Sequence, residues 1–323
     1  MLGGTGWWVC AVAFAAQTGG DSSTEAATAK LPAETLIVKG AWSSASDSKT
    51  PVPEAGIVVD RRYTNEYFGL EYPLPANWIQ QYQGPPPSDS GYYVLAQIIP
   101  RDSSDGANRG TLLITAHDLF FTPVRATNAR EFVDDLAGQL GAGYEVEQPP
   151  SQLRIRDQDF VQFGYAAPAI GLHWYVLATE IRCHVVQFVF TTRDRALTNE
   201  LLREFQKGLR GAPDGMSPPS SGVTPVCVKD YASPGNVVKR VAPLLLEHPF
   251  NPIPVRVMID KEGKVRHVHF LAAFPSDART ITDALLQWRF KPYVMDGRPV
   301  EVETGIVFGR ELPVAFGRPR GDP

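Results

Sequence analysis

The side chains best suited to metal binding in this sequence are six histidines and three cysteines. His267 and His269 are separated by one residue, so on a strand both imidazoles would project from the same face and could share a metal ion. The spacing places no acidic ligand beside them, the cysteines show no zinc-ligand spacing, and an alternating strand also needs a polar face. We therefore expect a polar strand face here and no metal site.

The motifs of common enzyme classes are missing from the sequence. It contains no GxSxG nucleophile elbow, no P-loop, no HExxH helix and no GxGxxG loop. Asp134 and Asp135 belong to the surface of an expected helix, where such pairs are more often solvated than catalytic. We expect no enzyme and no cofactor. A hydrolase remains an alternative if His117, His173 and His184 converge in a pocket.

Two cysteines lie in the part of the chain that is expected to fold, Cys183 and Cys227. They can pair if the protein folds in an oxidising compartment. Cys183 lies in an apolar strand pattern and Cys227 follows a linker, so two separate buried thiols are the favoured interpretation. Cys183 and His184 are not expected to hydrogen-bond to each other, because adjacent strand residues point to opposite faces.

The composition indicates a folded protein rich in strands and turns. Of 323 residues, 43% are hydrophobic and 20% are charged, which is enough apolar matter for folded cores. The 28 glycines and 28 prolines disfavour long helices. A net charge of -4 supplies no basic field for non-specific nucleic-acid binding. We expect an α+β protein of about two domains with no nucleic-acid partner.

The amino terminus has the pattern of an export signal. Residues 7–16 form an apolar run of ten residues, which suits a signal-peptide core and is too short to span a membrane. Ala13 and Ala15 are small residues at the two positions that a signal peptidase recognises. No Lys or Arg precedes the run, a gap that a start codon chosen too far downstream would explain. We expect a leader at 1–16 and a periplasmic protein; an inner-membrane anchor is the alternative.

Two segments without periodicity mark the domain boundaries. Residues 17–59 are rich in Ser, Thr, Ala, Gly and Pro and are predicted to be a disordered tether. Residues 211–222 (GAPDGMSPPSSG) are predicted to be a linker, because proline and glycine disfavour both helix and sheet. The folded domains are therefore expected at 60–210 and 223–310, with a flexible tail at 311–323.

The first domain is expected to be an antiparallel sheet with two helices. Residues 129–140 and 197–209 carry apolar side chains at helical spacing, and Asn128 is the expected N-cap of the first helix. Runs of strand length occur at 67–72, 92–99, 111–116, 153–155, 160–166, 172–181 and 185–190.

The opening of this domain resembles a known family. Tyr67-Phe68-Gly69-Leu70, followed by Pro75 to Trp78, is similar to the start of PsbP/Mog1-type domains, and the resemblance covers about Tyr63 to Leu209. It implies an antiparallel-sheet fold of the α/β/α type and a non-enzymatic binding module. A scaffold of this kind does not specify a chemistry.

The second domain is expected to be small, with the order ββαβ. Gly263 and Gly297 supply the positive φ that tight turns need. Trp288 and Phe290 are expected to anchor the sheet against its helix, and Pro292 to end the strand of Phe290. The expected elements are a short helix at 237–246, strands at 254–260 and 265–271, a helix at 277–288, and strands at 290–293 and 299–308.

The order and the motifs of the second domain resemble the carboxy-terminal domain of the TonB family of energy transducers, over about 223–310. The resemblance implies that the outer edge of the last strand accepts a partner strand by β-augmentation. The residues that carry the motifs are Asp260, Gly263, Trp288, Phe290, Pro292 and Gly297. The implied partner-binding residues are Val300, Val302, Thr304, Ile306 and Phe308.

These patterns together predict an exported interaction protein. Its second domain would bind a protein segment, from an outer-membrane receptor or another envelope protein, without catalysis. Only an uncleaved leader would bring it into contact with a membrane. Family members have a membrane-spanning helix that residues 7–16 are too short to form. The alternative is a TonB-type energy transducer for outer-membrane transport, anchored in the inner membrane if the true start lies upstream.

Overall fold

A computed structural model of the chain describes residues 56–82, 91–101, 110–122, 126–211, 225–245, 252–271, 273 and 275–309. All of them fall within one unit of the chain, Glu34–Pro323. The predicted leader and tail, most of the predicted tether and nearly all of the predicted linker lie outside the described residues. We call 56–211 the N-terminal region and 225–309 the C-terminal region.

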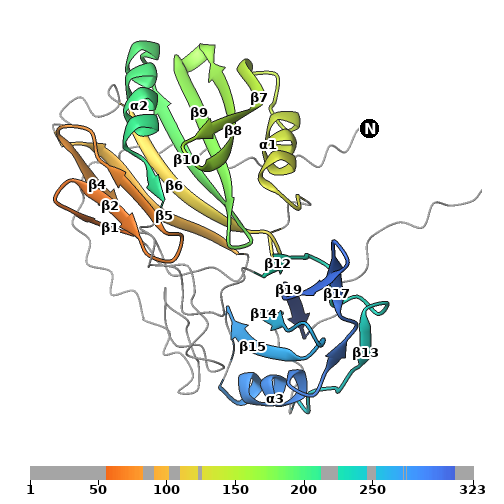
Figure 1. Cartoon of the computed structure of the whole chain (residues 1–323). Coiled ribbons are helices and arrows are strands. Elements are labelled where there is room, and N and C mark those ends of the chain that lie inside the picture. Colours follow the sequence, from red (N-terminus) through yellow and green to blue (C-terminus); the bar gives the residue numbers. More distant parts are fainter. Residues whose placement is uncertain are drawn as a thin grey trace, which may run out of the picture. The chain divides into compact units, whose positions relative to one another are not determined.

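A seven-stranded antiparallel sheet forms the centre of the N-terminal region, with strand order β4-β5-β6-β10-β9-β8-β7 (Figure 1). The expected strands at 92–99, 111–116, 160–166, 172–181 and 185–190 are present, and β7 begins well before the predicted Leu153. The strands are β4 (Trp78–Tyr82), β5 (Tyr92–Pro100), β6 (Thr111–Asp118), β7 (Glu145–Ile155), β8 (Gln158–Ala167), β9 (Leu172–Ile181) and β10 (His184–Thr192).

A second, small sheet of this region has the order β1-β2-β3-β11. The strand predicted at 67–72 starts only at Leu70, because a turn closed by Gly69 N–H donating to Glu66 O precedes it. β1 lies within the predicted tether. The strands are β1 (Ile57–Val59), β2 (Arg62–Asn65), β3 (Leu70–Pro73) and β11 (Arg210–Gly211).

Both faces of the large sheet are covered. Helix α1 (Ala129–Gly138) packs on one face through Phe132 and Val133, and its N-cap Asn128 accepts a hydrogen bond from Glu131 N–H, as predicted. Helix α2 (Arg195–Gly208) packs with the small sheet on the other face around Phe205. A single 3-10 turn, η2 (Pro168–Ile170), connects β8 and β9. The α+β class with a mainly antiparallel sheet is therefore confirmed.

The C-terminal region has a four-stranded sheet with order β12-β19-β14-β15 and a core of its own against helix α3 (Pro275–Leu285). Its strands are β12 (Val226–Cys227), β14 (Ile253–Ile259), β15 (Val265–Phe270) and β19 (Val302–Phe308). Two short pairs complete it: β13 (Val237–Lys239) with β16 (Arg289–Phe290), and β17 (Tyr293–Met295) with β18 (Arg298–Val300).

Three predicted elements of this region are wrong. The strand expected at 290–293 is divided into β16 and β17, which pair with β13 and β18. Residues 237–246 were expected to be helical, but β13 occupies their start, because the β-branched pair Val237-Val238 lies alongside β16 and Pro243 disfavours a helix. The final strand expected at 299–308 is divided at Glu301. Its first part pairs with β17 in a tight hairpin and its second part pairs with β14, so the two parts have different partners.

The turn between β14 and β15 explains the Asp-x-x-Gly pattern. Asp260 Oδ1 accepts hydrogen bonds from the N–H groups of Glu262 (3.0 Å) and Lys264 (2.8 Å). Gly263 has a φ of 78°, and a Cβ at this position would collide with the carbonyl oxygen of Phe290. Phe290 N–H in turn donates to Gly263 O at 2.8 Å. Position 263 thus requires glycine for two reasons, its positive φ and its lack of a side chain.

The other residues of the motif also lie at structural positions. Trp288 is buried and donates through Nε1 to Val241 O at 2.8 Å. Phe290 is buried beside it and stacks on Tyr231, with ring centroids 5.9 Å apart. Pro292 is exposed between β16 and β17, and Gly297, with a φ of 74°, forms the β17–β18 turn.

We predict that Gly263→Ala lowers the free energy of unfolding by at least about 2 kcal/mol, because it adds a collision to an unfavourable φ. Gly297→Ala is the matched control. Its φ is also positive, but a Cβ there meets no described atom within 4 Å, so a loss of about 1 kcal/mol is expected. Urea unfolding followed by circular dichroism measures both. Equal losses in the two variants would contradict the role of the Phe290 contact.

Candidate functional site

The residues predicted to bind a partner strand lie on two elements. Val300 belongs to β18, whereas Val302, Thr304, Ile306 and Phe308 belong to β19. The side chains of these four β19 residues are buried, three of them in the core against α3. A partner strand would therefore contact the backbone edge of β19 and not these side chains.

Part of this edge is occupied by β12, which sequence reasoning missed. β12 runs parallel to β19, and the N–H groups of Val226 and Val228 donate to the carbonyl oxygens of Glu301 (2.8 Å) and Glu303 (3.0 Å). The signal for β12 was short, since only two β-branched residues flank Cys227. A strand this short could not be distinguished by its sequence from the preceding linker.

The outer edge of β19 continues past β12. Backbone groups alternate in direction along a strand, so Gly305 and Val307 present theirs on the same side as Glu303. Val307 lies opposite Pro254, which has no N–H and whose carbonyl accepts from Leu271 N–H (3.1 Å). Val307 and Pro254 are thus a pair without mutual hydrogen bonds. No described strand pairs with β19 at these outward-facing positions.

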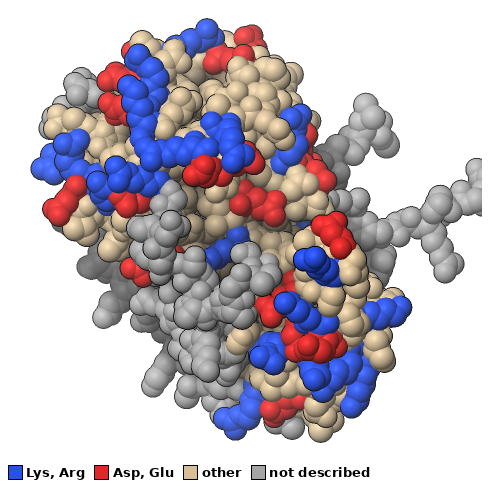
Figure 2. Space-filling view, in the orientation of Figure 1, with Lys and Arg blue, Asp and Glu red and all other residues tan. Residues whose placement is uncertain are grey.

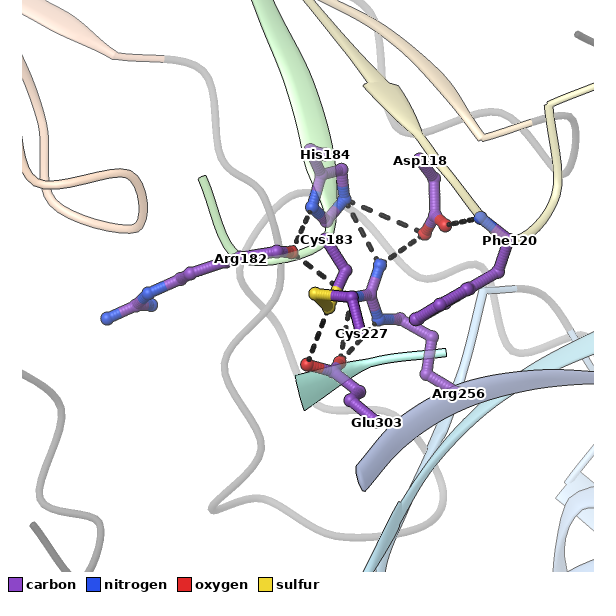
Figure 3. The surroundings of a disulfide bond; sticks show 8 residues. All are labelled: Asp118, Phe120, Arg182, Cys183, His184, Cys227, Arg256 and Glu303. Carbon is purple, nitrogen blue, oxygen red and sulfur yellow. Dashed lines mark hydrogen bonds and ion pairs between the residues drawn. A yellow bond between two sulfur atoms is a disulfide. The ribbon is translucent and has the colours of Figure 1, made fainter. Parts of the chain in front are cut away.

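A disulfide joins Cys183 to Cys227 beside this edge (Figure 3). The favoured expectation of two separate thiols is therefore wrong. Cys183 does not lie inside a strand: Arg182 and Cys183 form the turn between β9 and β10, with φ values of 51° and 59°. A residue in a turn does not follow the alternating side-chain directions of a strand. The side chain of Cys183 can therefore reach Cys227, 44 residues away in the sequence.

A buried cluster of charged side chains surrounds the disulfide (Figure 3). Arg256 of β14 donates through Nη1 to Asp118, at the end of β6, and through Nε (2.8 Å) to Glu303 of β19. Arg256 Nη2 donates to Arg182 O at 3.3 Å and lies 2.7 Å from Glu303 Oε1. The guanidinium also stacks on the ring of Phe120, 4.9 Å from the centroid. All three nitrogens of Arg256 are engaged.

Burial governs the protonation of this cluster. Arg256 is 4% exposed and Asp118 is fully buried. Burial raises the pKa of Asp118, and the charge of Arg256 opposes this rise. Burial would lower the pKa of Arg256, but Asp118 and Glu303 raise it well above its usual value. The structure thus keeps the guanidinium charged between two acidic side chains.

His184 completes the cluster as a neutral imidazole. Burial, and then the charge of Arg256, lower the pKa of His184 well below its usual value. Nδ1 lies 2.6 Å from Arg182 O, which can only accept, so Nδ1 carries the hydrogen. Nε2 therefore accepts from Arg256 Nη1 at 3.2 Å. This arrangement suits a structural junction between β6, β10, β14 and β19.

The other histidines in the described ranges lie in different surroundings. His117 packs between the rings of Tyr92 and Phe132, and His173 Nδ1 lies 3.0 Å from Glu147 Oε2. His184 has other ring neighbours, Tyr67, Phe68 and Tyr93, so the three histidines do not share one set of contacts. His269 is buried, which corrects the expected polar face of β15. Among the described residues, no group of three or more His, Cys, Asp or Glu side chains is placed to hold a metal ion.

The surface of the described residues adds two observations. Basic and acidic side chains are intermingled over the face shown in Figure 2. The helices in the described ranges are all too short or too polar to cross a membrane.

Comparison with known proteins identifies no family. No protein-family model matches the chain, and no curated protein matches it. Among the solved structures that match, a PsbP of the cyanobacterium Synechocystis is 15% identical over 46% of this chain and 91% of its own, with a TM-score of 0.31. LpqN of Mycobacterium tuberculosis, described as involved in cell envelope biogenesis, is 13% identical over 45% of this chain and 83% of its own, with a TM-score of 0.31.

A third match, a protein from Bacteroides thetaiotaomicron, is 11% identical over 46% of each chain, with a TM-score of 0.28. Of the two matches that are described by a protein name, one is a PsbP and neither is a TonB protein. At this level of likeness none of them assigns the chain to a family or a function.

We predict that Arg256→Met lowers the free energy of unfolding by about 3–5 kcal/mol, because it leaves the carboxylate of Asp118 buried without its cation. Adding Asp118→Asn should restore part of this loss, since the amide oxygen can still accept from Phe120 N–H. Arg154→Met is the control: its ion pair with Asp159 is exposed, and about 0–1 kcal/mol is expected. Urea unfolding with the disulfide intact measures all three, and a loss for Arg256→Met no larger than the control's would contradict the cluster's role.

We also predict a loss of stability in acid that depends on His117. Burial lowers the pKa of His117 to about 4. The stability that the neutral ring contributes is complete above the unfolded pKa of about 6.5 and is lost as the pH falls toward 4, by at most about 3 kcal/mol. His117→Phe should shrink this loss, because it keeps an aromatic ring without a titrating group. Urea unfolding between pH 7 and pH 4 measures it, and an unchanged slope would contradict the assignment.

Proposed function

We propose that this chain is an exported, non-catalytic interaction protein that binds an extended segment of another protein along the outer edge of β19. The observation that carries the proposal is the outward-facing backbone of Gly305 and Val307, beside which no described strand lies. Strand addition uses such backbone groups for affinity. The resemblance of 223–310 to TonB carboxy-terminal domains implies the same mode of binding.

The disulfide supports export. Disulfides persist in oxidising compartments such as the bacterial periplasm and are rare in the reducing cytosol. Cys183 is 1% exposed and Cys227 is half-buried, so the bond is part of the folded structure. An export pattern at residues 7–16 agrees with this compartment. Fractionation of the native protein, with amino-terminal sequencing, tests the proposed location: a cytosolic product would contradict it.

The binding proposal is tested with a displayed library of random twelve-residue peptides, selected against the full chain. Peptides that add a strand should protect the amides of Gly305 and Val307 from hydrogen exchange. The amides of Thr304 and Ile306 point toward β14 and should change little. Selected peptides that protect residues elsewhere, or none of these, would contradict binding at β19.

We predict that Val307→Pro abolishes binding of the selected peptides, because proline removes the outward N–H of this edge position. Val307→Thr is the matched control: it changes the same side chain, which is 50% exposed, but keeps the N–H, so its affinity should stay within about threefold of the native value. Titration calorimetry measures the affinities, and thermal unfolding checks that both variants fold. Equal binding by the two variants would overturn the proposal.

A further inference from the structure

We propose that the Cys183–Cys227 disulfide is a redox latch: it keeps β12 on the outer edge of β19, and its reduction by an external dithiol opens that edge. The inference rests on the proposed function, because it concerns the same edge. It gives a reason for the position of the disulfide, whose Cys227 lies directly opposite Glu303 in the β12–β19 pairing.

Few interactions other than the disulfide keep β12 in place. The strand has two residues. The N–H groups of Val226 and Val228 donate to the carbonyl oxygens of Glu301 and Glu303, and directly after the strand Lys229 O accepts from the Thr304 hydroxyl of β19 at 3.1 Å. Its side chains are only half-buried. After β12, the chain is anchored again at Tyr231, which is buried and stacks on Phe290. Breaking the disulfide would therefore free a short segment without freeing the rest of the region.

The Cys183 side of the bond is fixed independently of the disulfide. Leu119 N–H donates to Cys183 O at 3.0 Å, and Arg256 donates to Arg182 O. Two consecutive non-glycine residues with positive φ persist only where their surroundings over-determine them. The ion pairs of Arg256 with Asp118 and Glu303 do not involve sulfur, so they survive reduction. The mobile partner is therefore Cys227 on β12.

The exposure of the two cysteines sets the order of the exchange reaction. Cys183 is 1% exposed whereas Cys227 is half-buried, so a thiolate of the dithiol attacks Cys227 Sγ. The sulfur–sulfur bond breaks and Cys183 leaves as a thiolate that takes up a proton from solvent. The second thiol of the reductant then attacks the mixed disulfide and releases Cys227. The reductant ends as a disulfide, and both cysteines end as thiols.

Glu303 favours the reduced form. Its Oε2 lies 3.5 Å from Cys183 Sγ (Figure 3). A disulfide sulfur carries no hydrogen and cannot donate to this oxygen, whereas the Cys183 thiol can. Reduction thus adds an interaction at the point where it removes the covalent bond. When β12 separates from β19, the carbonyl groups of Glu301 and Glu303 become available for hydrogen bonds. Together with the backbone groups of Gly305 and Val307 they form one longer edge for a partner strand.

Hydrogen exchange of the full chain, before and after dithiothreitol under native conditions, tests the latch without any peptide. The amides of Val226 and Val228 should lose at least tenfold in protection on reduction. The amides of Phe290 and Lys291, which donate to Gly263 O and Asn236 O in the same region, should not change. A Cys183→Ser/Cys227→Ser variant should show the reduced pattern with and without dithiothreitol.

Three results would overturn the latch: a disulfide that dithiothreitol does not reduce in the folded protein, unchanged protection of Val226 and Val228, or loss of protection throughout the region. Failure of the latch can be distinguished from failure of the proposed function. If peptides that need Val307 bind the oxidised and reduced forms equally, only the latch is overturned. If exchange changes as expected but no selected peptide needs Val307, strand binding is overturned.

Discussion

Arg256 lies almost fully buried between two carboxylates that come from different sheets, Asp118 at the end of β6 and Glu303 on β19. A buried charge is tolerated only where partners replace the water it has lost, and here every nitrogen of the guanidinium has one. The position of β14 and β19 next to the end of β6 depends on this arrangement. Removing Arg256 would leave the fully buried Asp118 without its cation.

The disulfide and the strand edge lie around the same cluster. Arg182 O accepts from both Arg256 and His184, so the turn that carries Cys183 is part of the hydrogen-bonded network. Glu303 contacts Arg256, faces the sulfur of Cys183 and pairs with β12 through its backbone. One residue of the last strand thus links the ion pairs, the disulfide and the edge. The proposed effect of reduction on the edge of β19 would therefore act through this one residue.

Short-range patterns predicted much of the fold. Alternating apolar and polar residues predicted the β14–β15 hairpin. Apolar residues at helical spacing, with Asn128 as N-cap, predicted α1. Gly263 and Gly297 were correctly placed in turns, because a positive φ is a local requirement that the residue type itself meets. The failures at 237–246 and at Glu301 have one cause. In both places the choice of strand partner, which lies elsewhere in the chain, overrides the local pattern.

By itself, the sequence determined the α+β class and most strands and helices; the binding edge on the last strand stays a prediction. Only the tertiary structure decided that Cys183 meets Cys227, that β12 covers part of this edge, and that Arg256 is buried with Asp118 and Glu303. Periodicity reports which face of an element is buried. It does not report which distant element lies against that face, and each of these three features depends on residues far apart in the chain.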